Sequence, residues 1–194
     1  MAVDYYSGNF WLTLEQMQVN AKFFAVKMLE LGWSLNAICG VLGNAQVESR
    51  INPGIWQDLT PNNEWGYGLL QWDPAGEKIL KWSAEEGLDP SRMETQIRYI
   101  NEDNLLPTEY RQYYVDKSMK YPETFLEFKV STKDVGYLAE AFEANYERAN
   151  APDIETRRLN AIYWFNYLQG ISPTQTKRRK LPLYMMLRRK RIWR

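Results

Sequence analysis

Apolar residues recur at helical spacing along most of the chain, and residues 13–31 are the first segment to show this pattern. Its apolar positions, which lie three, four or seven residues apart, are Met17, Phe24, Met28 and Leu31. That spacing places them on one face of a helix. Thr13 followed by Gln16 is a capping-box signature, and Gly32 is placed to end the helix. The pattern therefore predicts an amphipathic helix over residues 13–31.

A second helical segment follows Ser34, which is a suitable N-cap. The stretch "NAICGVLGNAQVESRINPG" (residues 36–54) is apolar and helical in pattern until its last turn. That turn presents Glu48 directly before Ser49, and the chain then breaks at Asn52-Pro53-Gly54. A carboxylate at the end of so apolar a helix raises the question of what it does there.

Further helix signals follow, most of them with a capping residue or a proline at the start. Asp73-Pro74 and Asp89-Pro90 each pair a capping residue with proline at the first helical position. Thr132 and Asp153 are further candidate caps. The expected helices cover residues 74–86, 90–105, 121–129, 132–148 and 153–169.

Residues 55–72, "IWQDLTPNNEWGYGLLQW", lack helical periodicity. Two aromatic-rich runs flank "TPNNE", which predicts an irregular β-hairpin or a long ordered loop. We expect a mainly α, α+β domain: helices with one small β-hairpin or loop region beside the second helix. An N-terminal arm (1–12) would precede a domain over residues 13–170, and a linker with a basic tail would occupy residues 171–194.

The composition fits a folded domain with an uneven charge. Of the 194 residues, 45% are hydrophobic and 14% aromatic, which is enough for a substantial core. The formal charge is zero, but residues 177–194 hold nine Lys or Arg and no acid, leaving 15 basic against 24 acidic groups before them, a net of −9. An acidic body excludes a nucleic-acid-binding face on the folded domain, where positive charge would be needed. The basic tail could dock on an acidic protein partner, contact anionic polymers or a membrane surface, or be disordered.

Several kinds of chemistry are excluded by absent residue types. The chain has no histidine and one cysteine, Cys39, so it offers no Ser-His-Asp or Cys-His arrangement, no His-ligated zinc site and no intrachain disulfide. We expect no cofactor and no metal. The start "MAVDYYSGNF" lacks the features of a signal peptide, and no run reaches the roughly 18 to 20 apolar residues of a transmembrane segment. If the protein acts outside the cell that made it, something else must carry it there.

Carboxylate chemistry remains, and Glu48 is its best candidate. The apolar residues that precede it in the helix are Ile38, Val41, Leu42 and Val47. Such surroundings remove hydration and disfavour the ionised form, as a general acid of glycoside cleavage requires. Gly40 and Gly43 would let another backbone or a ligand approach closely. The alternative is an exposed glutamate in the last turn of an ordinary helix.

The segment "GYGLLQW" (66–72) suits a saccharide cleft. Gly66 and Gly68 favour a tight turn or close contact with a ligand. Gln71 offers both a donor and an acceptor to an N-acetyl group or a sugar hydroxyl. The aromatic side chains crowded into this region, whose faces suit sugar rings but equally suit a core, are Trp56, Trp65, Tyr67 and Trp72. Those set in predicted helices, Trp33, Trp82 and Trp164, are assigned to the core.

These residues together carry a family resemblance. "GNAQVESRINPGIWQ" followed by "GYGLLQW" resembles the phage tail lysozyme family, the wall-degrading domain of phage tail-tip and tail-knob proteins. The "ES" and "GxGLxQ" pairing is also similar to goose-type lysozymes and soluble lytic transglycosylases. The resemblance covers most of residues 11–170, including "LTLEQMQVNAKFF", "GWSLNAICGVLGN" and "FEANYERAN".

The resemblance implies roles for individual residues. Glu48 would be the catalytic acid, and Gln71 would line the sugar cleft. Tyr146, in "NYER", would lie near the catalytic acid and orient it, with a core tyrosine as the alternative. The full set of expected substrate-binding residues is Gln71, Tyr67, Trp56, Trp65, Tyr146 and Ser49.

A second carboxylate is harder to assign. An inverting hydrolase needs a base roughly 6.5 to 9.5 Å from the acid, whereas a transglycosylase needs none. Asp73 stands where goose-type lysozymes have an acid, but as a helix N-cap before Pro74 it already has a structural role. Glu64, with Asp58 behind it in the loop, is the preferred candidate base.

The predicted function is hydrolysis of the β-1,4 MurNAc–GlcNAc bonds of peptidoglycan, a lysozyme or muramidase activity. The chain would be carried on a phage tail, with peptidoglycan strands and other virion proteins as partners, and would open the host wall during DNA entry. One alternative is a lytic transglycosylase that uses Glu48 alone. Another is a structural tail subunit that binds glycan without cutting it.

Overall fold

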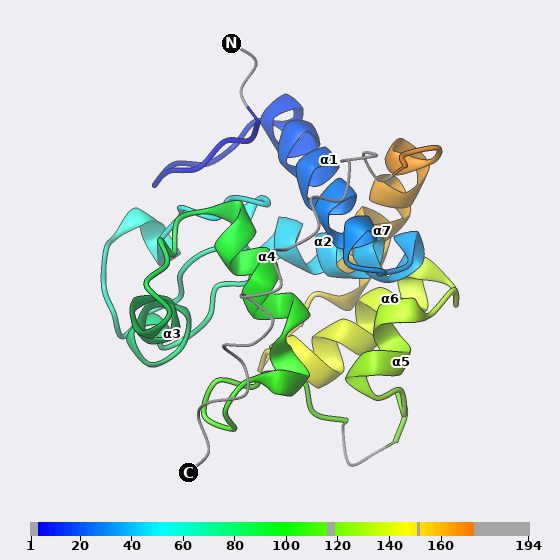
Figure 1. Ribbon diagram of the computed structural model, residues 1–194. Helices are drawn as coiled ribbons and strands as arrows, with labels where there is room; N and C mark the ends of the chain where they lie inside the picture. Colours follow the sequence, from blue (N-terminus) through cyan, green and yellow to red (C-terminus); the bar gives the residue numbers. More distant parts are fainter. Residues whose placement is uncertain (1–3, 116–118, 151, 173–194) are drawn as a thin grey trace, which may run out of the picture.

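The chain folds into a mainly helical structure, as its apolar periodicity predicts. A computed structural model describes residues 4–115, 119–150 and 152–172. Its α-helices are α1 (Leu14–Glu30), α2 (Leu35–Ser49), α3 (Ile79–Glu85), α4 (Met93–Asn101), α5 (Phe125–Val130), α6 (Val135–Phe142) and α7 (Ile154–Leu168). Short 3₁₀ turns cover Gln57–Leu59, Ala75–Glu77 and Asp103–Leu105, and a π-helical turn covers Glu143–Glu147. The mainly α fold class is confirmed (Figure 1).

The caps of three helices agree with the sequence. Thr13 and Gln16 form the reciprocal capping box of α1, with the Thr13 hydroxyl accepting from the Gln16 N–H. Ser34 accepts from the Ala37 N–H at the start of α2. Asp153 accepts from the Thr156 N–H at the start of α7. Each cap satisfies an N–H that has no partner within its own helix, which is why these boundaries are readable from sequence.

Other boundaries were predicted wrongly because local side-chain bonds start the helices later. The Asp89 carboxylate accepts from the backbone N–H and the hydroxyl of Ser91, so it closes a turn and α4 begins only at Met93. Thr124, in a capping box with Glu127, starts α5. Asp134 rather than Thr132 caps α6, and α6 gives way to the π-helical turn after Phe142.

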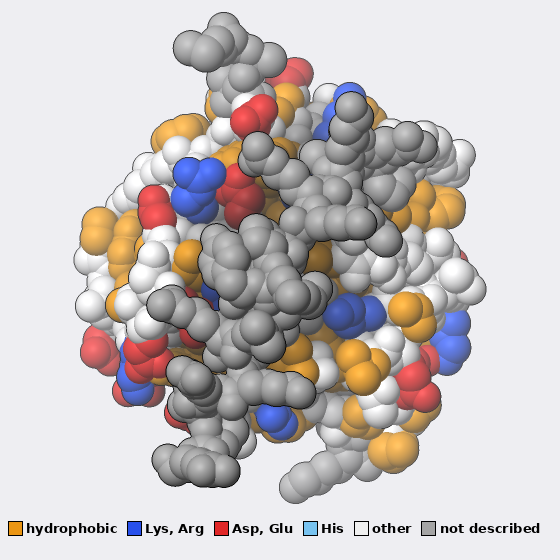
Figure 2. Space-filling model, in the orientation of Figure 1, with side chains coloured by type: hydrophobic (Ala, Val, Ile, Leu, Met, Phe, Trp, Pro, Cys, Tyr) orange, Lys and Arg blue, Asp and Glu red, His pale blue; other side chains and the backbone are white. Residues whose placement is uncertain are grey.

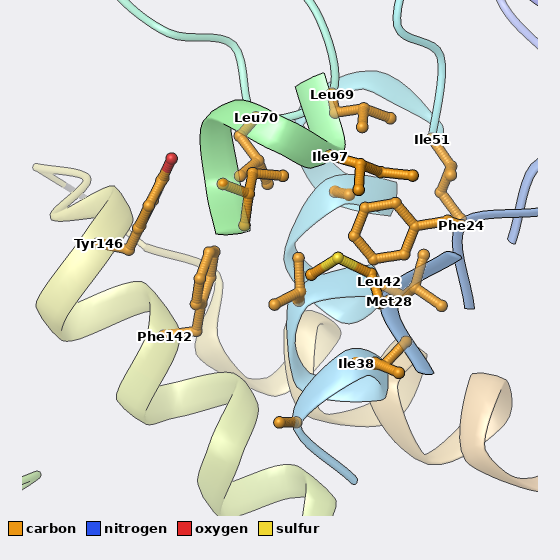
Figure 3. Close-up of a cluster of buried hydrophobic side chains, with 14 of the residues drawn as sticks. Phe24, Met28, Ile38, Leu42, Ile51, Leu69, Leu70, Ile97, Phe142 and Tyr146 are labelled. Atoms are coloured by element: carbon orange, nitrogen blue, oxygen red, sulfur yellow. The ribbon is translucent and has the colours of Figure 1, made fainter. Parts of the chain in front are cut away.

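Helix α2 is the centre of the molecule, and α6 and α7 pack directly against it (Figure 1). The two predicted close approaches are both to backbone. A Cβ on Gly40 would lie 3.0 Å from the Leu138 carbonyl carbon of α6, and one on Gly43 would lie 2.5 Å from the Arg157 carbonyl oxygen of α7. Figure 3 shows side chains of α1, α2, α4 and the loop after α2 meeting in one core. Trp33, Trp82 and Trp164 are buried in that core, as predicted.

Residues 50–72 form an ordered loop held by isolated backbone bridges. Tyr67 pairs in antiparallel fashion with Trp56 and with Trp72, without a continuous strand ladder in the described chain. Gln96 of α4 accepts from the Leu69 N–H and donates to the Pro53 carbonyl, which ties the loop to the helices. The sequence left a hairpin and an ordered loop open, and the observed structure is the loop.

The N-terminal arm lies along this loop. Asn52 donates from Nδ2 to the carbonyls of Gly8 and Phe10, at 2.8 and 2.7 Å. Asn9 donates to the Leu59 carbonyl and accepts from the Trp56 N–H. In Figure 1 the dark-blue arm runs out beside the cyan segment that follows α2 and returns to α1. These bonds fix residues 8–12 on the domain.

The surface is mixed in charge on the face that Figure 2 shows, where acidic and basic side chains alternate with apolar ones. Within the described residues, none of the helices combines the length and apolarity that crossing a bilayer requires. The basic tail from residue 173 onward lies outside the described residues.

Candidate active site

Glu48 lies in the last turn of α2, where the apolar helix reaches the surface. Its side chain is 21% exposed, and its Oε1 accepts a hydrogen bond of 2.5 Å from Nη2 of Arg157. The Arg157 side chain is only 4% exposed. Oε2 of Glu48 makes no hydrogen bond within the described chain. The carboxyl is therefore held by one oxygen, and the other is available to a ligand.

The short distance between α2 and α7 explains this ion pair. Gly43 removes the side chain that would keep α7 away, since a Cβ there would collide with the Arg157 backbone. Arg157 then reaches across α2, donating from Nη1 to Oδ1 of Asn44 at 2.8 Å and from Nη2 to Glu48. Asn44 in turn donates to the Gly40 and Ala139 carbonyls. The guanidinium is thus oriented by two fixed acceptors, which is the geometry that arginine favours.

Two further carboxyl groups lie near this pair. Glu143 and Glu147 come from the π-helical turn, and the charges of Glu48 and Arg157 act on both. Burial raises the pKa of Glu143, although its carboxylate accepts from the Ala149 N–H. Burial, together with the negative charge of Glu48, raises the pKa of Glu147 well above its usual value. Oε1 of Glu147 is buried without a hydrogen-bond partner among the described residues. Burial therefore disfavours the charged form of Glu147, and Arg157 forms its ion pair with Glu48.

Replacing Glu147 with Gln should change how stability depends on pH. The pKa of Glu147 is raised in the folded state, so its contribution to stability is complete below the unfolded value and is lost as pH rises toward the folded value. The Gln variant does not titrate. Its free energy of unfolding, minus that of wild type, should therefore increase as pH rises above the ordinary glutamate pKa of about 4.3. Urea unfolding at several pH values measures this, and a difference that stays constant with pH would contradict it.

A cleft of about 340 Å³ opens beside Glu48. The residues that line it are Trp11, Glu48, Gln57, Asp58, Gln71 and Asp73. Four of them were singled out from sequence, and they come from the end of α2 and from three points of the following loop. Carboxylates, amides and one indole around an open groove are the side chains that bind saccharides in proteins.

Asp73 does not have the structural role predicted for it. The turn that follows is a 3₁₀ turn over Ala75–Glu77, its N-cap position is the extended Pro74, and it has no side-chain cap. Helix α3 begins only at Ile79. The Asp73 carboxylate makes no hydrogen bond or ion pair within the described residues and is exposed in the cleft. The helix-cap prediction is therefore wrong, and the carboxylate is free for another role.

Gln71 faces the same cleft in a defined orientation. Its backbone is left-handed, with φ 43°, and its Nε2 donates to the Gly68 carbonyl at 3.0 Å and to the Ile55 carbonyl at 3.3 Å. Both bonds use the amide nitrogen, so Oε1 remains able to accept a bond from a ligand N–H or O–H. The structure thus places Gln71 in the cleft beside Glu48, and its substrate-binding role stays a prediction.

The other predicted aromatic residues of the loop have different environments. Tyr67 is buried, with its ring centroid 4.6 Å from that of Trp56, and burial raises its pKa to about 12. Trp56 is half-buried. Trp65 and Glu64 are exposed in the loop, and neither is among the residues that line the cleft beside Glu48. The candidate base Glu64 is thus not brought together with Glu48 in this cleft.

Ser49 and Tyr146 point into the protein. The Ser49 hydroxyl lies 2.8 Å from the Leu69 carbonyl oxygen and accepts from the Asn52 N–H, so it joins α2 to the loop. The Tyr146 hydroxyl accepts from Trp72 Nε1 at 3.0 Å. Its ring stacks on Phe142, and burial raises its pKa well above 10 (Figure 3). Tyr146 is thus linked to the cleft only indirectly: it binds Trp72, and the residues on either side of Trp72, Gln71 and Asp73, line the cleft.

Sequence reasoning missed four residues of this region: Trp11, Gln57, Glu147 and Arg157. Trp11 lies in the arm that was placed outside the domain, and Gln57 in the loop beside Asp58. Glu147 directly follows Tyr146, so the "NYER" motif contained it. Arg157 had only one signal, which was its place on a helix rich in aromatic residues.

Sequence comparison gives two findings. The family described as phage tail lysozyme matches this chain over residues 19–168. The chain is also 40% identical over 181 residues to a protein called Morphogenesis protein 1 from Bacillus phage B103. That alignment covers 92% of this chain but 47% of the phage protein, so the chain spans about half the length of this relative.

Proposed function

Because this chain belongs to the phage tail lysozyme family, we propose that it cleaves the β-1,4 bonds between MurNAc and GlcNAc in peptidoglycan, with Glu48 as the general acid. The observation that carries the proposal is the cleft. It brings together the carboxyl of Glu48, the amide of Gln71 and the carboxylates of Asp58 and Asp73, unpaired within the described chain, around one groove.

Glu48 would act through its free oxygen. Arg157 holds Oε1, so Oε2 would present the proton to the glycosidic oxygen. As the bond between C1 and that oxygen breaks, the proton moves to the leaving sugar and the ring acquires oxocarbenium character. The neighbouring guanidinium would stabilise the carboxylate that Glu48 becomes.

Hydrolysis also needs a group that activates water, and we infer that Asp73 supplies it. Its carboxylate is unpaired and lines the same cleft as Glu48. It directly follows Trp72, whose indole is buried and bonded to Tyr146, so its backbone is firmly placed. Asp58 lines the cleft as well, but it lies in an exposed 3₁₀ turn. Water would lose a proton to Asp73 while its oxygen bonds to C1, which yields a reducing sugar.

The setting in which this would happen is the phage particle. The family is one of phage tails, and the relative from Bacillus phage B103 is named for morphogenesis. We propose that the chain belongs to a tail component, is located at the tail tip, and opens the host wall for DNA entry. Other virion proteins would be its partners, with peptidoglycan strands as its substrate.

Analysis of wall digests tests the reaction type. Purified peptidoglycan incubated with the protein should yield fragments with reducing ends, each carrying one added water, as seen by mass spectrometry. Asp73→Asn should lower the rate by about 10²-fold or more, as loss of a general base does. Asp58→Asn, from the same cleft, is the matched control and should retain most activity.

Other outcomes assign the reaction differently. Anhydro-muramic ends, together with an active Asp73→Asn variant, would overturn hydrolysis in favour of a lytic transglycosylase that uses Glu48 alone. A loss of rate in Glu64→Gln rather than Asp73→Asn would restore the base favoured by the sequence. A wild-type protein that binds walls without cutting them would support the remaining alternative, a structural tail subunit that binds glycan.

A further inference from the structure

The N-terminal arm contributes an aromatic side chain to the cleft. Trp11 lies eight residues before the segment that matches the family, yet it lines the cleft with Glu48 and Gln71. Its side chain is 46% exposed, while the next residue, Leu12, is buried in the core. An exposed tryptophan alone would mean little, since single exposed apolar residues are common. Its position in a polar cleft is what calls for an explanation.

The residues before and after Trp11 in the sequence are both anchored to the domain. Leu12 anchors the chain on one side, and Asn52 binds the carbonyls of Gly8 and Phe10 on the other. The Arg50 guanidinium lies over the indole, 5.2 Å from the ring centroid. Arg50 is the left-handed C-cap of α2, two residues after Glu48. The side chain at the C-terminal end of α2 therefore packs against the ring.

The ligand that fits such a ring is a sugar. The other side chains of the cleft are carboxylates and amides, which suit hydroxyl and N-acetyl groups. A flat indole face suits the apolar C–H face of a pyranose ring, and a ring held rigid before binding loses little entropy on contact. A protein partner would favour a broader apolar surface than one indole among polar groups.

We propose that Trp11, held by Arg50 and by the N-terminal arm, forms a saccharide-binding subsite of the cleft. This proposal rests on the proposed function, because it names the part of the chain that binds one sugar of the same strand. The subsite lies on the arm side of Glu48. It would add affinity for long glycan strands without taking part in the chemistry.

Binding in a catalytically inactive background separates this subsite from catalysis. The protein is the full chain carrying Glu48→Gln, and the probe is chitohexaose, a soluble hexamer of N-acetylglucosamine. Its Kd is measured by isothermal titration calorimetry. Trp11→Ala should weaken binding about tenfold, which corresponds to about 1.4 kcal/mol of binding free energy. Trp11→Phe should recover most of the affinity.

Phe10→Ala is the matched control, because Phe10 is on the same arm, is 44% exposed and does not line the cleft. Its Kd should equal that of the parent. Thermal unfolding of each variant checks that the arm remains folded on the domain. Equal affinity of Trp11→Ala and the parent would overturn the subsite while leaving the proposed function intact. A parent that binds neither chitohexaose nor purified peptidoglycan would overturn the subsite as well, and wall digestion by the wild type would then decide the proposed function separately.

Discussion

Replacing Glu48 with Gln is expected to abolish cleavage of wall glycan, by about 10³-fold or more, while leaving the fold intact. General acid catalysis alone contributes about 10²–10⁴-fold, and Glu48 is the only described carboxyl that is hydrogen-bonded to Arg157. The Gln side chain retains an oxygen that can accept from Arg157 Nη2, so the guanidinium keeps a partner. The amide has no proton that it can give to a leaving alkoxide.

The measurement is release of reducing or anhydro ends from purified walls, together with circular dichroism of the same samples. Glu155→Gln is the control, because Glu155 is an exposed carboxylate on α7, two residues before Arg157. It should retain wild-type activity. Full activity of Glu48→Gln would refute the mechanism, and it would do so for the hydrolase and the transglycosylase alike, since both need this acid.

The part of the fold that could be predicted is the part fixed by local bonds. Thr13, Ser34 and Asp153 satisfy N–H groups within three residues of themselves, so the sequence alone contains both partners. The end of α2 directly after Glu48 and Ser49, and the close approaches at Gly40 and Gly43, were equally local in their signals. Asp73 shows the limit of such reasoning: the Asp-Pro pair has the composition of a cap, but no helix begins there.

The part of the site that could not be predicted depends on long-range packing. Arg157 is 109 residues from Glu48 in sequence, and only the contact of α7 with α2 brings them together. Glu147, whose Oε1 is buried, lies in a π-helical turn, whereas the sequence pattern predicted a regular helix over residues 132–148. Trp11 reaches the cleft through bonds of Asn52 to the arm, which no periodicity reveals.

Loss of Arg157 should be the most damaging change to stability in this region. Arg157→Met removes the only guanidinium bonded to Glu48 in the described residues, and it leaves Asn44 Oδ1 without the donor that it has now. Removing one partner of a buried pair costs about 3–5 kcal/mol, and the partial exposure of Glu48 places the expected value at the lower end of that range. Arg157→Lys should recover only part of it, because an ammonium cannot hold Asn44 and Glu48 in the same fork.

Urea unfolding of Arg157→Met, Glu48→Gln and the double variant gives the coupling between the two side chains. Arg158→Met is the matched control: it is the next residue of α7, is 41% exposed and pairs with Glu140, so its loss should cost about 0–1 kcal/mol. Equal costs for the two arginines would show that burial of Arg157 does not strengthen its pair.

In the wall assay, Arg157→Lys should lower kcat with KM little changed, since Arg157 holds Glu48 and does not line the cleft. A rise in KM alone would instead mean that Arg157 acts on substrate binding. A fall in kcat alone would show that Arg157 links the packing of α7 against α2 to the chemistry at the end of α2, because its guanidinium orients the acid and compensates the charge of the carboxylate.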